Sequence, residues 1–291
     1  MKTVLVLGAN GQLGKCFQEL SVRENDIDWL FMDSSEVNLT SNFDVQQCFS
    51  NKRIDYCINC AAYTTVEKAE SESDRAFLIN ADAVKNLAEI CKKSNTVLFH
   101  FSTDYVFEGT AQMPYIENDL TAPLNVYGES KLKGENYIRD IANCYFIFRT
   151  SWLYSQFGHN FFKTVLSKAE KGEELNITSA QQGAPTNANH LAKLVLELIK
   201  GQNTQFGTYH FSNTGETSWY GFAEEILKVS GNLESIKLNK DNTYKTIAER
   251  PVYSVLDTSK VEKTFDYNIL SWKEAVAELY NDHFTEKRGL K

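Results

Sequence analysis

The chain has 291 residues, 42% hydrophobic and 23% charged, so it can bury a large core in one big domain or in a large and a smaller one. Its formal net charge of −8 at pH 7 argues against a protein that binds nucleic acid, because the phosphates need a basic face. The first apolar run is too short for a signal peptide and no stretch approaches the roughly eighteen apolar residues of a membrane span, so we expect a cytoplasmic protein.

The first predicted element is a buried strand that ends in a glycine turn. The apolar run at residues 4–7 stops at the sequence GANGQLG, residues 8–14. Apolar residues then recur at helical spacing, at Leu13, Cys16, Phe17 and Leu20. A strand, a glycine turn and a helix N-terminus can together bind the pyrophosphate of a dinucleotide. The spacing G-x-x-G-x-x-G differs from the commoner G-x-G-x-x-G and indicates a variant of this turn.

A second apolar run, residues 29–32, ends at Asp33, nineteen residues after Gly14. An acidic residue at this place can bind the hydroxyl groups of the adenosine ribose. Because its charge would repel a 2′-phosphate, Asp33 favours NAD over NADP.

Cys57 and Cys60 lie in the next strand-like run, residues 56–60, and form a C-x-x-C. An odd separation on a strand directs the two side chains to opposite faces, so we interpret both as core residues. A redox pair would need a helix N-terminus and a zinc site would need a second pair of ligands, and the sequence offers neither. The five histidines are scattered without ligand spacing, so we expect structural or surface roles for them and no metal site.

Farther along the chain, strand-like and helical runs alternate, which is typical of a parallel sheet covered by helices on both faces. The remaining predicted elements are a helix at 82–93, strands at 97–101 and 145–148, a helix at 191–200, a strand at 207–211, a helix from Ser218, a polar stretch at 239–246 and a helix at 272–280. We therefore expect an α/β fold: a Rossmann-type doubly wound parallel sheet with a smaller C-terminal α/β substrate domain. The NAD(P)-binding domain should cover residues 1–150, rejoined by about 187–212, and residues 151–291 should form mainly the substrate-binding domain.

Candidate polar residues follow the carboxyl ends of three predicted strands, where open parallel sheets bind their ligands. These segments are residues 59–64, 101–105 and 149–154. Thr103 could hydrogen-bond a substrate oxygen, but a threonine at a strand end could equally cap a turn. Asp104 and Tyr105 leave the same two possibilities open.

Tyr127 precedes Lys131 by four residues, a spacing that puts both side chains on one face of a helix. A tyrosine hydroxyl has an unperturbed pKa of about 10, so it exchanges protons poorly at neutral pH unless a nearby cation stabilises its phenolate. A surface lysine that covers a half-buried ring would give the same pattern, so the pair alone does not establish catalysis.

Taken together, these segments resemble the extended short-chain dehydrogenase/reductase family, and within it the reductases of nucleotide-linked 4-keto sugars. The matching segments are GANGQLG at 8–14, NCAAYT at 59–64, STDYVF at 102–107, PLNVYG at 123–128, RTSW at 149–152 and RP at 250–251. The resemblance implies reduction of the 4-keto group of dTDP-4-dehydro-L-rhamnose to dTDP-L-rhamnose by NADPH or NADH, for nucleotide-sugar and cell-surface polysaccharide biosynthesis. It implies a dTDP-linked 4-keto-6-deoxyhexose as the binding partner and a monomer or homodimer.

The resemblance also places roles on residues of this chain. Tyr127 would protonate the substrate, Lys131 would lower the Tyr127 pKa and bind the nicotinamide ribose, and Thr103 would orient the carbonyl. The expected cofactor contacts are Gly8, Gly11, Gln12, Leu13, Gly14, Asp33, Asn38, Leu39, Ala62, Tyr63, Thr64, Phe101, Tyr127 and Lys131. The expected substrate contacts are Thr103, Asp104, Tyr105 and Trp152.

Two other enzymes of the superfamily and one non-enzyme remain as alternatives. A nucleotide-sugar dehydratase would have an acid directly after Thr-Asp, where this chain has Tyr105, and an epimerase typically lacks the Ser-Thr-Asp-Tyr run. A regulatory subunit similar to the β subunit of methionine adenosyltransferase could keep both the tyrosine and the lysine. The nucleotide and the sugar would be read by the C-terminal half, where Trp152, Arg250 and residues 183–186 are candidates.

Overall fold

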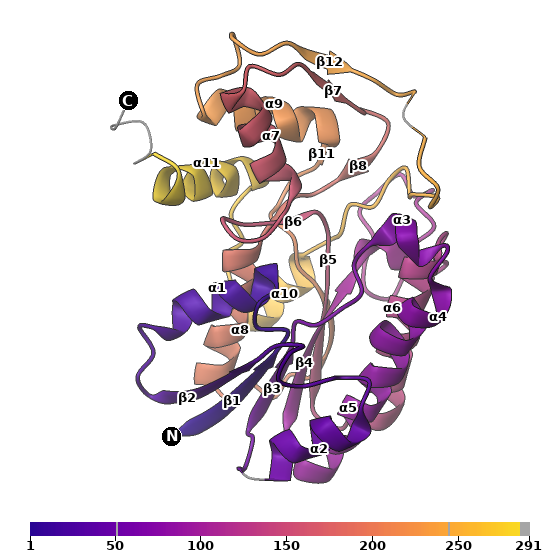
Figure 1. The fold of residues 1–291 in the computed structure, drawn as a ribbon, viewed down its shortest axis with the longest axis vertical. Helices are drawn as coiled ribbons and strands as arrows, with labels where there is room; N and C mark the ends of the chain where they lie inside the picture. The colour runs from indigo at the N-terminus through magenta and orange to yellow at the C-terminus, as the bar shows by residue number, and fades with distance from the viewer. Residues whose placement is uncertain (51, 244, 286–291) are drawn as a thin grey trace.

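A computed structural model describes residues 1–50, 52–243 and 245–285 of the chain (Figure 1). In chain order the elements are β1 (Lys2–Leu7), α1 (Gln12–Ser21), β2 (Ile27–Met32), α2 (Asn42–Ser50), β3 (Tyr56–Asn59), α3 (Val66–Ala69), α4 (Ser73–Phe77), the π-helical turn η1 (Leu78–Asp82), α5 (Ala83–Ser94), β4 (Val97–Thr103), the 3₁₀ turn η2 (Asp104–Val106), α6 (Val126–Ile141), β5 (Tyr145–Thr150), β6 (Leu153–Tyr154), α7 (Phe161–Glu170), β7 (Leu175–Ile177), β8 (Gln182–Gly183), β9 (Thr186–Asn187), α8 (Ala188–Lys200), β10 (Gly207–His210), β11 (Thr217–Ser218), α9 (Trp219–Val229), β12 (Leu238–Lys240), α10 (Ser259–Phe265) and α11 (Trp272–His283).

Six parallel strands form the central sheet, in the order β10-β5-β4-β3-β1-β2. The chain winds outward from β1 to β2 and then crosses back to β3 on the other side of β1. The strand order therefore reverses between β1 and β3, and a ligand crevice is expected beyond the carboxyl ends of these two strands. The doubly wound Rossmann-type sheet that the sequence predicts is confirmed.

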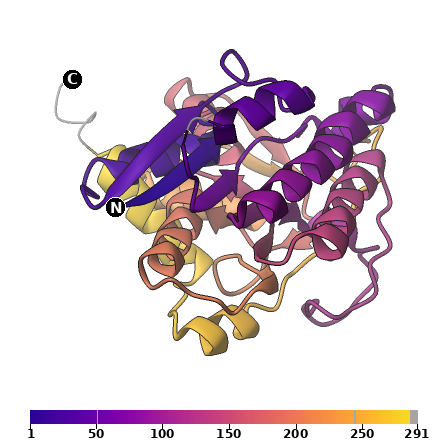
Figure 2. The same cartoon turned by 90° about the horizontal axis from the view of Figure 1, so that it is seen from below.

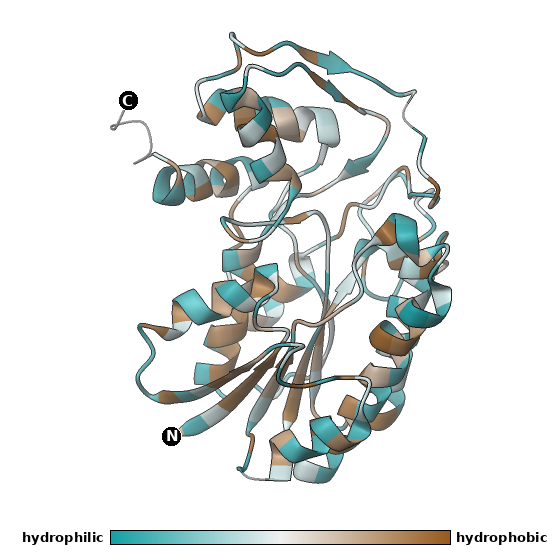
Figure 3. Cartoon of the chain, in the orientation of Figure 1, coloured by the Kyte–Doolittle hydropathy of each residue, from teal (hydrophilic) through white to brown (hydrophobic). Residues whose placement is uncertain are grey.

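Helices cover both faces of the sheet, with α1 and α8 on one side and α2, α5 and α6 on the other (Figure 1). Alternation along β1 explains the two layers, because Val4 and Val6 face α1 and α8 while Leu5 and Leu7 face α5. The view turned by 90° shows the sheet running between these layers (Figure 2). The strands are correspondingly apolar along most of their length (Figure 3).

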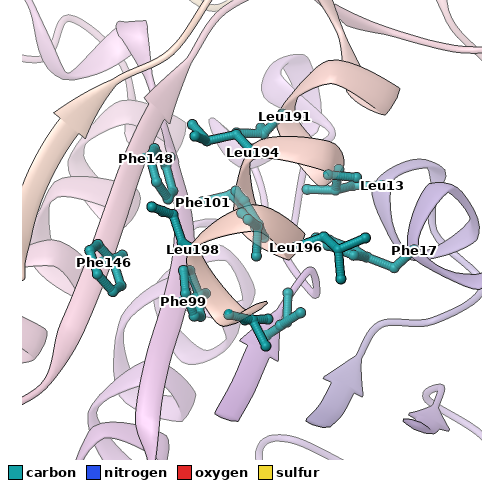
Figure 4. Close-up of a cluster of buried hydrophobic side chains, with 14 of the residues drawn as sticks. Leu13, Phe17, Phe99, Phe101, Phe146, Phe148, Leu191, Leu194, Leu196 and Leu198 are labelled. Carbon is teal, nitrogen blue, oxygen red and sulfur yellow. The ribbon is translucent and has the colours of Figure 1, made fainter. Parts of the chain in front are cut away.

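Aromatic side chains dominate the core on the α1 and α8 side. Phenylalanines from β4 and β5 face the leucines of α8, as the close-up shows (Figure 4). Phe99 and Phe146 are fully buried and stack with their ring centroids 4.9 Å apart. Burial of one such side chain contributes about 1.5–3 kcal/mol, so this cluster holds the sheet rigid beneath the strand ends.

Cys57 and Cys60 are core residues, as expected from their spacing. Cys57 packs in the cluster on the α5 side of the sheet, whereas Cys60 packs against the cluster on the α1 side. Burial raises the pKa of both thiols, the opposite of what a redox pair requires. The six cysteines, all within the described residues, form no disulfide.

The C-terminal half builds a second apolar cluster, in which α7, α9 and α11 pack together above the sheet (Figure 1). Between these helices the chain returns to the sheet through α8 and β10. The polar stretch predicted at 239–246 begins within β12, which pairs with β7, and its position 244 lies outside the described residues, as do residues 286–291. No helix in the described ranges has the length and apolar character needed to cross a bilayer.

Candidate active site

Gly8 and Gly14, at the two ends of the glycine-rich segment between β1 and α1, lie where a side chain would have no room. Gly8 adopts a φ of +74°, and a Cβ there would lie 2.6 Å from the backbone nitrogen of Ala61. A Cβ on Gly14 would lie 2.5 Å from the carbonyl oxygen of Gly8, so this glycine lets α1 pack against the turn. The helix begins at Gln12, where its first backbone N–H groups have no partner within the helix and can bind an anion.

One cavity of about 330 Å³ lies beside this turn, beyond the ends of β1, β2 and β3. Its lining includes the predicted contacts Gly8, Gly11, Asp33, Asn38, Leu39 and Ala62. The Asp33 carboxylate accepts hydrogen bonds from the Ser35 hydroxyl at 2.6 Å and from the Ser35 backbone at 2.7 Å, and these hold the Asp33 pKa below its usual value. Asp33 therefore faces the cavity as an anion.

A second cavity of about 480 Å³ continues from the first, sharing Gly11 and residues 60–62 with it. It brings together most of the other predicted residues, namely Gln12, Leu13, Thr64, Phe101, Thr103, Asp104, Tyr105, Tyr127, Lys131 and Trp152. Tyr63 and Gly14 line neither cavity. Tyr63 instead donates from its hydroxyl to Glu72 at 3.2 Å, and its backbone N–H donates to Asn80.

The strand β4 ends at Thr103, directly against the second cavity. The Thr103 hydroxyl donates to Asp104 Oδ1 at 3.0 Å and accepts from the backbone nitrogen of Tyr105 at 3.1 Å, so it caps the turn η2 as well as lining the cavity. Asp104 is buried, which raises its pKa to about 6 although the hydroxyls of Ser254 and, to a smaller extent, Thr103 oppose the shift. Within the described residues its other carboxylate oxygen, Oδ2, is buried without a hydrogen-bond partner, and it could accept one from a ligand hydroxyl.

Tyr127 and Lys131 both lie on α6, as their spacing predicts, and both line the second cavity. The helix starts there because the side chain of Asn125 accepts from the backbone nitrogen of Gly128 at 2.8 Å. Tyr105 meets Tyr127 edge-on, with ring centroids 6.0 Å apart. These contacts fix the phenol ring at the cavity wall.

The electrostatics of the pair differ from the expectation. Burial raises the pKa of Tyr127 to about 12, with the nearby Thr103 hydroxyl opposing the shift, and burial lowers the pKa of Lys131 to about 8. The Lys131 Nζ donates to the carbonyl oxygen of Phe101 at 2.6 Å, and the described residues show no hydrogen bond from it to Tyr127. The Tyr127 pKa is therefore raised where the sequence predicts a lowering, because burial of the phenol outweighs the opposing effect of the Thr103 hydroxyl.

Elements from the C-terminal half form another wall of the second cavity. Trp152 adopts a φ of +47° and stacks on Trp219 with ring centroids 3.8 Å apart. Its indole lies flat against Gly183, where a Cβ would be 2.7 Å from the ring. Arg250 does not line the cavity, but it pairs with Glu67 at 2.6 Å and so ties residue 250 to α3.

Several residues at or near the cavities escaped the sequence reasoning, and three of them bear polar or aromatic side chains of interest. His159 and Trp219 line the second cavity, and His100 lies behind it in contact with Lys131. The signal for His100 was strand alternation, which puts it on the α6 side of β4, whereas nothing local marks the other two. Within the described residues no group of three or more His, Cys, Asp or Glu side chains could hold a metal ion.

Comparisons with known proteins agree with this geometry. The pattern of the family described as RmlD substrate binding domain matches residues 1–284. The chain is 37% identical to the dTDP-4-dehydrorhamnose reductase of Escherichia coli (strain K12), over 97% of this chain and 98% of that one. Two solved structures are also similar: a dTDP-4-dehydrorhamnose reductase from Clostridium acetobutylicum, with a TM-score of 0.90, 35% identity and coverage of 96% and 98%, and one from Bacillus anthracis in complex with NADP, with a TM-score of 0.91, 36% identity and coverage of 97% and 100%.

Proposed function

We propose that this chain, which belongs to the RmlD substrate binding domain family, is an NAD(P)H-dependent oxidoreductase that reduces the 4-keto group of dTDP-4-dehydro-L-rhamnose to give dTDP-L-rhamnose. The observation that carries the proposal is the continuity of the two cavities, which joins a dinucleotide-binding turn to Tyr127 and Thr103 at the strand ends. Relatives that carry the reductase name match this chain over nearly their whole length, which supports the same reaction here.

The residues around the first cavity fit a dinucleotide. Gly8 and Gly14 leave the backbone of the turn bare, so we assign the pyrophosphate to this turn and to the N-terminus of α1. Asp33 would accept hydrogen bonds from the adenosine ribose, and Asn38 and Leu39 would lie at the adenine. When bound, NADPH or NADH supplies the hydride that reduces the keto carbon.

Tyr127 is the proposed proton donor to the oxygen of the reduced carbonyl. Its pKa of about 12 keeps the hydroxyl protonated at neutral pH, but an acid this weak needs positive charge nearby, which Lys131 would supply as the ammonium, to release the proton as negative charge develops on the substrate oxygen. Thr103, whose hydroxyl lines the same cavity, would hydrogen-bond that oxygen and hold it within reach of Tyr127. Lys131 would bind the nicotinamide ribose.

We assign the sugar and the nucleotide to the wall beyond Thr103. Asp104 would accept from a sugar hydroxyl through its buried Oδ2, and Trp152 would pack against the sugar ring. We propose that α7, α9 and α11 form the substrate domain and that the enzyme acts as a monomer or homodimer in the cytoplasm.

A direct measurement of cofactor consumption tests the reaction. Addition of dTDP-4-dehydro-L-rhamnose to the protein and NADPH or NADH should consume one equivalent of reduced cofactor per dTDP-L-rhamnose formed. Tight cofactor binding without turnover, together with capture of a larger enzyme, would instead indicate a regulatory subunit. Exchange of sugar stereochemistry without net loss of reduced cofactor would indicate an epimerase.

A further inference from the structure

His100 has both ring nitrogens against nitrogen atoms, an arrangement that restricts where protons can lie. Its Nδ1 is 3.2 Å from Asn59 Nδ2, and its Nε2 is 3.3 Å from Lys131 Nζ. The ring is fully buried in β4, so these two neighbours decide which nitrogen carries the proton. Neither neighbour is a group that usually accepts a hydrogen bond.

The orientation of Asn59 is fixed by its other contact. Its Oδ1 accepts from the backbone nitrogen of Ala61 at 3.1 Å, and the swapped amide would set two N–H donors against each other. Asn59 Nδ2 therefore donates to His100 Nδ1. A neutral imidazole that accepts at Nδ1 carries its proton on Nε2. A doubly protonated ring is disfavoured, since burial holds the His100 pKa well below its usual value and Lys131 lowers it further whenever it is charged.

This tautomer constrains Lys131. The Nε2–H of His100 points at Nζ, and an ammonium has three donors and no lone pair to accept it. The contact becomes a hydrogen bond when Lys131 is the neutral amine, which can still donate to the carbonyl oxygen of Phe101 at 2.6 Å. Burial, which lowers the Lys131 pKa to about 8, acts in the same direction.

Acidic groups near Lys131 favour its ammonium form, and burial of the lysine acts against them. Glu135 on α6 favours the ammonium, but it is held by Arg149 of β5, whose Nη2 donates to it at 2.8 Å, and by Arg139 at 2.9 Å. Tyr127 of α6 and Asp104 of η2 line the same cavity as the lysine. Burial keeps Tyr127 neutral at physiological pH, whereas Asp104, whose pKa burial raises to about 6, is a carboxylate there and favours the ammonium as Glu135 does.

His210 is a second buried histidine, and its two ring nitrogens face one hydrogen-bond acceptor and one donor. Its Nδ1 is 2.9 Å from the carbonyl oxygen of Tyr115 and must carry the proton, while its Nε2 is 3.4 Å from Arg149 Nη1 and must accept. The two buried histidines thus hold opposite tautomers, and His210 provides an internal reference for His100.

We propose that Asn59 and His100 are positioning residues that act through Lys131: Asn59 selects the Nε2–H tautomer of His100, and this N–H stabilises Lys131 as an amine. The consequence for catalysis rests on the proposed reduction. The ammonium form of Lys131 is the form that favours charge on Tyr127, so turnover should fall as the pH rises through the Lys131 pKa. His100 would then set the upper limit of the working pH range.

The tautomer can be measured directly on the wild-type protein labelled with ¹⁵N-histidine. Long-range ¹H–¹⁵N correlations distinguish the two tautomers, and the His100 signal is identified by its loss in His100→Phe. We expect His100 as Nε2–H and His210 as Nδ1–H at pH 8. An Nδ1–H tautomer at His100 would overturn the proposal, and this measurement requires no enzymatic activity.

The sign of a pKa change gives the second test. In His100→Phe the amine of Lys131 loses its hydrogen-bond donor, so the Lys131 pKa should rise by about one unit, a tenfold change in the ratio of ammonium to amine. The titration is followed by NMR of ¹³Cε-labelled lysine, and the Lys131 signal is assigned by its loss in Lys131→Met. If His100 instead accepts from an ammonium, the same variant moves the titration down, and a downward or absent shift overturns the proposal. His283→Phe, an exposed histidine on α11, is the matched control and should leave Lys131 unchanged.

The pH profile of turnover separates this proposal from the proposed function. The upper limb of the profile should move in the same direction as the Lys131 titration in His100→Phe. If the protein shows no reductase activity, the reaction assignment fails, whereas the two NMR measurements still decide the roles of Asn59 and His100. Thermal unfolding and an unchanged His210 signal establish that the variant keeps its fold.

Discussion

Gly14→Ala should weaken cofactor binding through the shape of the turn, because the added methyl group does not contact the cofactor itself. The new Cβ would lie 2.5 Å from the carbonyl oxygen of Gly8 and 2.6 Å from that of Ala9, and both are backbone atoms of the dinucleotide-binding turn. Relief of such contacts requires the turn or α1 to shift, and overpacking of this kind costs about 1–3 kcal/mol. The turn can relax in the free protein but must regain its shape to bind pyrophosphate, so we expect the cost to appear in binding.

Because each 1.4 kcal/mol changes an affinity tenfold, the Kd for NADPH should rise about 5- to 150-fold. Calorimetric titration of the variant with NADPH and with NADH measures this. Gly201→Ala is the matched control, since Gly201 has a φ of −72° at the end of α8 and a Cβ there would meet Glu197 O at 3.2 Å. A Gly14→Ala protein that binds both cofactors within twofold of wild type would refute the assignment of the turn.

Three further variants test other parts of the account. Tyr127→Phe should lower kcat by about 10²- to 10⁴-fold while the Kd for NADPH stays within twofold, and near wild-type turnover would remove Tyr127 as the acid. Gly183→Ala should displace the Trp152 indole, which a Cβ would approach to 2.7 Å, and so raise the KM for the nucleotide sugar with cofactor affinity unchanged; an unchanged KM would separate Trp152 from the substrate. Glu135→Gln should destabilise the protein by about 3–5 kcal/mol in urea unfolding, because it leaves Arg149 buried without its carboxylate. Burial would raise the Glu135 pKa, but hydrogen bonds and charge from Arg149 outweigh it and leave the pKa below its usual value. Ionised Glu135 therefore stabilises the fold above its unfolded-state pKa, and this contribution is lost as the pH falls through the lower, folded-state pKa. Between pH 7 and pH 3, the free energy of unfolding should fall more steeply for wild type than for Glu135→Gln.

The sequence predicted those features that depend on local pattern. The strands of the sheet, the glycine turn and Asp33 follow from apolar runs and spacing, and the structure has them where they were expected. Tyr127 and Lys131 share a helix because four residues make about one turn. Thr103 lies at a strand end, as predicted, and it both caps a turn and lines the cavity.

Features that depend on packing between distant segments were beyond local reasoning. Trp219 reaches the cavity because α9 folds over the sheet and its indole stacks on Trp152, a contact across 67 positions that no spacing encodes. Tyr63 is one of the predicted cofactor contacts, but its side chain turns toward Glu72. The shift of the Tyr127 pKa likewise reflects the partial burial of the ring by other segments, which the i and i+4 spacing does not contain.

The central claim is that this chain transfers a hydride from a nicotinamide cofactor to a dTDP-linked 4-keto sugar, and its most direct test is one stoichiometric measurement. Purified protein is mixed with excess NADPH, or NADH, and a known amount of dTDP-4-dehydro-L-rhamnose, and loss of cofactor absorbance is compared with the dTDP-L-rhamnose formed. The account predicts one cofactor oxidised per product in the wild type and a rate at least about a hundredfold lower in Tyr127→Phe. Cofactor that binds both proteins equally but is oxidised by neither would contradict it.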